Sequence, residues 1–73
     1  MIYAELLKAE QAISPERNML PLRDAVNQIL AAAEDNAQDD EGRFESIRCM
    51  LCYPDPDWPA DVAAWFRAQG IDW

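Results

Sequence analysis

The spacing of apolar residues between positions 22 and 33 is the strongest constraint on how this chain can fold. These residues recur at intervals of three and four, at Leu22, Ala25, Val26, Ile29, Leu30 and Ala33. Because an α-helix has about 3.6 residues per turn, this spacing places all of them on one face. It predicts an amphipathic helix from about Pro21 to Glu34, whose apolar face must be buried against other parts of the chain.

The same period predicts a helix on each side of this one. The first runs from Ile2 to Ile13 and stops before Pro15, because a proline disfavours helical geometry in the residue that precedes it. The other follows a polar connection at residues 36–40, with Asp39 or Asp40 as its N-cap. It ends before Pro54, at the start of a proline-rich connection.

The sequence after this connection predicts a fourth helix. It begins near Pro59, buries the side chain of Val62 and ends at Gly70, a residue that tolerates the left-handed conformation of a C′ position. Ile71 follows directly and is placed to fold back onto the helix, as the apolar residue of a Schellman cap does.

The chain is therefore expected to be an all-α protein of three to four short helices. No segment alternates with a period of two, and 73 residues suffice for one small domain, residues 1–73. The predicted core consists of large side chains on the four apolar stripes: Leu6, Ile13, Leu22, Val26, Ile29, Leu30, Phe44, Ile47, Leu51, Trp65 and Phe66.

Missing residue types argue against most enzyme classes. The chain has no histidine and one lysine, Lys8, which removes imidazole metal sites, histidine-based catalysis and phosphate-binding loops of the Walker type. We therefore expect a protein that is not an enzyme and needs no cofactor.

The sequence also predicts where the protein is found. The first ten residues include acids where a signal peptide has bases, and no apolar run is long enough to cross a membrane, so a cytoplasmic location is expected.

Two cysteines, Cys49 and Cys52, form the one motif with a chemical interpretation. A zinc site needs four ligands, and a redox pair normally lies at a helix N-terminus, whereas these cysteines precede Pro54 at a helix C-terminus. The favoured interpretation is that both are small buried core residues that bind no metal in the monomer. A metal bridged between the two copies of a homodimer remains the alternative.

Negative charge is concentrated in one part of the chain. The whole sequence has 14 acids, six bases and a net charge of −8. Residues 34–45 contain six acids and one base, Arg43, and so have a net charge of −5. The six acids are Glu34, Asp35, Asp39, Asp40, Glu41 and Glu45. They form either a solvated loop that keeps the protein soluble or an anionic ridge that contacts a basic partner.

In the second interpretation the carboxylates imitate phosphates, so a cleft built to bind nucleic acid accepts the protein instead. Some small acidic proteins of phages and mobile elements, including certain anti-CRISPR proteins, act in this way. The chain resembles them in size, acidity and helical character. The negative charge disfavours direct binding to nucleic acid or to an anionic membrane.

The alternative function is that of a helical adaptor or homodimer with an apolar interface. Six of the seven aromatic residues lie after position 43. Trp58 and Trp73 are the two expected to be exposed and to act as anchors for a protein partner.

Overall fold

The helix at residues 20–36 lies at the centre of the fold and contacts each of the other helices. The computed structural model describes residues 2–73. Its helices are α1 (Tyr3–Gln11), a short 3₁₀ helix η1 (Arg17–Met19), α2 (Leu20–Asn36), α3 (Asp40–Cys52) and α4 (Asp61–Ala68). The described residues contain no strand, which confirms the all-α class.

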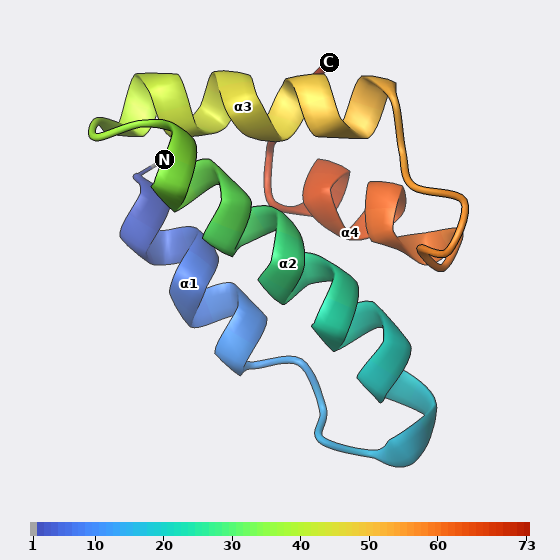
Figure 1. Ribbon diagram of the computed structural model, residues 1–73. Helices are drawn as coiled ribbons and strands as arrows, with labels where there is room; N and C mark the ends of the chain where they lie inside the picture. Colours follow the sequence, from blue (N-terminus) through green and yellow to red (C-terminus); the bar gives the residue numbers. More distant parts are fainter. Residues whose placement is uncertain (1) are drawn as a thin grey trace.

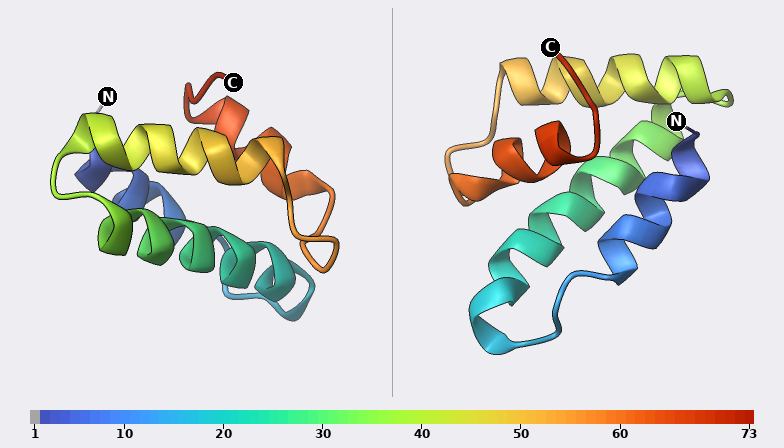
Figure 2. Two further views of the ribbon diagram at one scale, coloured as in Figure 1. Left: turned by 45° about the horizontal axis from the view of Figure 1, so that its top comes forward. Right: turned by 180° about the vertical axis from the view of Figure 1, so that it is seen from behind.

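The other helices are packed around α2. α1 runs antiparallel alongside α2, and α3 crosses over the end of both helices (Figure 1). α4 lies below α3 and packs on the remaining side of α2 (Figures 1 and 2). The turn between α2 and α3 and the connection from α3 to α4 therefore lie at opposite ends of α3 (Figure 1).

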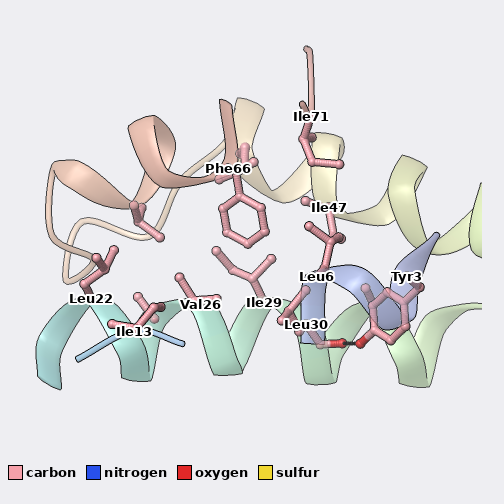
Figure 3. Packing of buried hydrophobic residues seen from close by; sticks show 14 residues of the cluster. Tyr3, Leu6, Ile13, Leu22, Val26, Ile29, Leu30, Ile47, Phe66 and Ile71 are labelled. Carbon is pink, nitrogen blue, oxygen red and sulfur yellow. Dashed lines mark hydrogen bonds between the residues drawn. The ribbon is translucent and has the colours of Figure 1, made fainter. Parts of the chain in front are cut away.

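The apolar stripe of α2 forms the floor of the core, as its spacing predicted. Figure 3 shows Phe66 of α4 pointing towards Ile29 of α2, with Ile47 of α3 beside it. All three side chains are fully enclosed. The buried set contains nine of the eleven predicted core residues. It also contains Ala25, Ala33, Val62 and Ile71, as the helix patterns predicted, and Tyr3.

The two remaining core predictions, Phe44 and Trp65, were wrong in the extent of burial. Both side chains are half-buried and pack against the edge of the core. Trp65 is one position before Phe66, which places it about 100° away around the helix. Because α4 is short and Phe66 faces α2, Trp65 covers the core from the side, with its ring edge-on to that of Phe66 at a centroid distance of 4.9 Å.

Two helix ends agree closely with the predicted caps. The Asp39 side chain accepts a hydrogen bond of 2.8 Å from the backbone N–H of Gly42, which makes Asp39 the N-cap of α3. At the end of α4, Gly70 has a φ of 92°. Ile71 N–H donates to Phe66 O and Gly70 N–H to Arg67 O, the two hydrogen bonds of a Schellman motif, and the Ile71 side chain is buried.

Three other helix ends differ from the prediction by two residues. α2 continues to Asn36, beyond Glu34. α1 ends at Gln11, two residues before Ile13, because the chain must already turn before Pro15. α4 begins at Asp61, two residues after Pro59, and the backbone N–H of Val62 in its first turn donates a hydrogen bond to Pro59 O. Its N-cap, Ala60, has no side chain able to cap the helix.

Candidate functional site

The six predicted acidic residues come together at the turn between α2 and α3. α2 ends at Asn36 and α3 begins at Asp40, so the last turn of one helix and the first turns of the other form a tight corner (Figure 1). We call this surface the acidic corner and define it by Glu34, Asp35, Asp39, Asp40, Glu41 and Glu45. All are exposed except Asp40, which is half-buried.

Three of these carboxylates have partners within the protein. Asp39 is the N-cap of α3. Asp40 accepts a 3.2 Å hydrogen bond from the backbone N–H of Tyr3 and lies 4.0 Å from Arg43 Nη1. Glu45 forms an ion pair of 3.2 Å with Arg48. The Asp39 and Asp40 contacts stabilise the starts of helices, and the second of them joins residues 37 apart in sequence, whereas the Glu45–Arg48 pair lies within α3. Half of the acidic corner therefore has contacts within the protein.

Arg43, the one base within residues 34–45, is directed inwards. Its Nε donates a 3.1 Å hydrogen bond to the backbone carbonyl of Ala37, and its guanidinium lies 4.9 Å from the centre of the Tyr3 ring. The positive charge is thereby used to fasten the turn to α1. It does not cover the exposed carboxylates of the acidic corner.

Glu34, Asp35 and Glu41 are the carboxylates of the acidic corner that have no side-chain partner. All three are exposed, and none takes part in an ion pair with another side chain of residues 2–73. The negative charges of Glu34 and Asp35 also act on a buried side chain, Tyr3. Burial raises the pKa of the Tyr3 phenol, and the charges of Glu34 and Asp35 raise it further, against an opposing effect from Arg43.

Glu34 and Asp35 are also placed unfavourably for their own helix. They lie in the last turn of α2, which contains no basic residue. The C-terminal end of a helix carries partial negative charge, so an acid there costs about 0.3–1 kcal/mol where a base would stabilise the helix. Asp39, Asp40 and Glu41 lie at the favourable end of α3, but helix stability does not explain Glu34 and Asp35.

The prediction that both cysteines are buried was wrong. Cys49 and Cys52 are free and exposed. Ile47 and Leu51 face the core from α3, and at about 100° per residue Cys49 is roughly 200° and Cys52 roughly 140° away from Ile47. The helical period, followed through this segment, indicates the solvent face. No three potential ligands among Cys, Asp and Glu are grouped as a metal site within the described residues.

The expected exposure of Trp58 and Trp73 was also wrong, because both are half-buried against the core. Trp58 Nε1–H donates a 3.4 Å hydrogen bond to Gln28 Oε1 on α2. The ring of Trp73 lies 4.3 Å from the guanidinium carbon of Arg67. Tyr53 is the exposed aromatic residue instead, at 84%. Its position just before Pro54, beyond the last turn of α3, is the sequence signal that could have indicated this.

Comparison with known proteins gives no family assignment. The chain matches no protein family, and it has no significant match to a characterised protein or to a solved structure. Within residues 2–73, no helix combines the length and the apolar character that crossing a membrane requires.

Proposed function

We propose that this protein is a non-enzymatic binding protein that uses its acidic corner to occupy a basic, nucleic-acid-binding surface on another protein. The observation that carries the proposal is the pair Glu34 and Asp35. These carboxylates are exposed, have no ion-pair partner within the described chain and lie at the helix end where they reduce stability. A contact with a basic partner would explain why two acids stand at a position that lowers the stability of α2.

The geometry of the corner suits such a contact. The Asp39 cap, the contact from Asp40 to α1 and the inward-directed Arg43 hold the turn between α2 and α3 in place. Glu34, Asp35 and Glu41 are therefore presented from fixed helix ends, so their backbone loses little conformational entropy when a partner binds, and the entropy cost is that of ordering the three side chains. Fixed carboxylates at helix ends can take the place of successive phosphates in a cleft lined by lysine and arginine.

On this proposal the protein acts in the cytoplasm as a stoichiometric inhibitor or regulator of the kind that phages and mobile elements direct against nucleic-acid-handling complexes. It blocks its partner by competition and needs no cofactor. The interaction is expected to weaken steeply as ionic strength rises, because it rests on exposed charges.

The test begins with capture of proteins from a bacterial lysate on the immobilised chain at low salt. Each retained protein is identified by mass spectrometry, and its binding to DNA or RNA is measured with and without the chain. The proposal requires that the chain displaces nucleic acid from the partner. It fails if nucleic acid and the chain bind the partner together, or if the complex is unaffected by salt.

A matched pair of variants separates the acidic corner from total charge. E34Q/D35N and E16Q/D72N each remove one exposed glutamate and one exposed aspartate. E34Q/D35N is expected to lower the affinity for the partner by about tenfold or more, whereas E16Q/D72N changes it by less than about twofold. Equal losses would assign the effect to net charge and not to the corner.

A second candidate function is self-association or adaptor binding through an apolar surface. It is favoured by the exposed ring of Tyr53 and by an apolar groove of about 430 Å³ where α1, α2 and α4 meet. The groove is lined by Ala9, Ala12, Ile13, Ser14, Met19, Leu22, Trp65 and Gln69. Light scattering at high salt tests self-association. A dimer that is lost in a Tyr53→Ser variant would support this function.

A further inference from the structure

A second acidic surface lies away from the acidic corner and is hollowed into a cleft. The cleft has a volume of about 410 Å³ and is formed between the first turns of α2 and the connection from α3 to α4. Its walls are Pro21, Asp24, Ala25, Gln28, Asp55, Asp57, Trp58 and Pro59. Asp24 lies about 16 Å along α2 from Asp35, so the two surfaces are separate.

The cleft is anionic and contains no base. Asp24, Asp55 and Asp57 contribute three carboxylates, and no lysine or arginine is among the lining residues. Arg23 is adjacent to Asp24 in sequence, but its guanidinium is directed to Glu10 of α1, with Nε 3.9 Å from Oε1. None of the ion pairs within residues 2–73 involves a carboxylate of the cleft.

The aromatic wall of the cleft is held in position. The hydrogen bond from Trp58 Nε1–H to Gln28 Oε1 ties the indole to α2. The loop that carries Trp58 is ordered by two further hydrogen bonds, from Trp58 N–H to Asp55 O at 3.1 Å and from Asp57 N–H to Asp55 Oδ1 at 2.8 Å. The indole and the Asp55 carboxylate therefore need little rearrangement to receive a ligand.

We propose that this cleft binds the guanidinium group of an arginine side chain on a protein partner. The combination of an indole wall and unneutralised carboxylates complements a flat cation. A guanidinium stacks on the face of an aromatic ring and donates paired hydrogen bonds to a carboxylate, whereas the ammonium of lysine does neither as well. The cleft adds a site of arginine recognition to a surface separate from the acidic corner, and its existence does not depend on the function proposed for that corner.

The probe is N-acetyl-arginine N-methylamide, titrated into the 73-residue protein at low salt. The side-chain N–H signals of the tryptophans are followed by NMR. The signal of Trp58 is expected to shift and to saturate in the millimolar range, with smaller changes at Trp65 and Trp73. The matching citrulline compound has almost the same shape without the charge and is expected to leave the Trp58 signal in place.

Two carboxylate variants localise the site. D24N/D57N is expected to weaken binding of the arginine probe by about fivefold or more, while the control D35N/D72N, with the same loss of charge elsewhere, changes it by less than about twofold. Both variants keep Trp58 and leave the core untouched, so a fold check by circular dichroism is expected to show no difference.

The proposal is overturned if the arginine probe does not shift the Trp58 signal, if citrulline shifts it equally, or if the two variants lose the same affinity. A lysine probe that binds as tightly as arginine would also overturn the assignment, because the site would then be a general cation site.

Discussion

The backbone N–H of Tyr3 donates a hydrogen bond to Asp40 Oδ2 over 3.2 Å, although 37 residues separate them. The N-cap residue of α1, Ile2, has no side chain that can cap the helix. Asp40 supplies the missing acceptor from the first turn of α3, so one aspartate stabilises the start of two helices. Some members of the acidic corner, such as Asp40, therefore stabilise the fold, whereas Glu34 and Asp35 do not.

Replacing Asp40 is expected to reduce stability. Asp40→Ala removes the acceptor for Tyr3 N–H and should lower the free energy of unfolding by about 0.5–2 kcal/mol, the usual cost of losing a helix cap. Glu41→Ala is the neighbouring control and should cost less than about 0.5 kcal/mol, since Glu41 is exposed. Urea unfolding followed by circular dichroism measures both. Equal costs would mean that Asp40 does not cap α1.

Neutralising the other end of the acidic corner is expected to have the opposite sign. E34Q/D35N removes two acids from the last turn of α2 and should raise the free energy of unfolding by up to about 1 kcal/mol at low salt. Asp39→Ala should lower it by about 1 kcal/mol, because the cap of α3 is lost. Added salt should shrink the gain from E34Q/D35N. A loss of stability in that variant would show that these acids have a structural role.

Gly42 is expected to resist replacement by alanine even though it lies within a helix. A Cβ at this position would lie 2.8 Å from both Asp39 Oδ1 and the Ala37 Cβ, too close for either contact. Gly42→Ala should therefore destabilise the protein instead of giving the usual gain of about 1 kcal/mol.

A double-mutant cycle tests the origin of that loss. In the Asp39→Ala background one of the two clashing groups is gone, so Gly42→Ala should cost less there than in the parent protein. Additive costs would place the strain at Ala37 alone, and a gain in stability for the single variant would contradict the packing of this turn.

The Tyr3 phenol is expected to make stability fall at high pH. Its O–H donates a hydrogen bond to the carbonyl of Leu30, and its pKa is raised above 10.0, chiefly by burial (Figure 3). A raised pKa in the folded state contributes stability that is complete below the unfolded pKa and is lost as pH rises through the folded one. Stability should therefore decline above pH 10.

The Tyr3→Phe variant isolates this effect. It should be about 0.5–1.5 kcal/mol less stable near neutral pH, because the hydrogen bond is lost, and its stability should fall less between neutral pH and pH 11. Tyr53→Phe is the control, and it should change stability little because that side chain is 84% exposed. Parallel alkaline curves for the parent and Tyr3→Phe would show that Tyr3 does not govern the decline.

Both thiols are expected to react in the folded protein. Because Cys49 and Cys52 are exposed, a disulfide reagent such as Ellman's should modify both at neutral pH without denaturant. The reaction should proceed at a rate similar to that in urea, and C49A/C52A should retain the helical signal. Protection of either thiol until the protein unfolds would restore the original expectation of buried cysteines.

The local pattern of the sequence determined the helices and most of their ends. The period of the α2 stripe, the Asp39 cap and the pairing of Gly70 with Ile71 each depend on residues within a few positions of one another, so sequence spacing is sufficient to predict them. The concentration of charge in residues 34–45 is likewise visible in the sequence. The exposure of Cys49 and Cys52 could have been predicted in the same way, from their angle to Ile47 around the helix.

Only the tertiary structure decided which charges are structural and which are free. Asp40 meets Tyr3, and Trp58 meets Gln28 beside Asp24, because α3 and the chain that follows it fold back on α1 and α2. Such contacts depend on helix packing angles and on the path of the proline-rich connection, and helical periodicity does not encode either of these. For the same reason the sequence showed that six acids lie in one segment, but it could not show which of the six have partners. Within the described chain, Asp39, Asp40 and Glu45 have them, and Glu34, Asp35 and Glu41 form no ion pair.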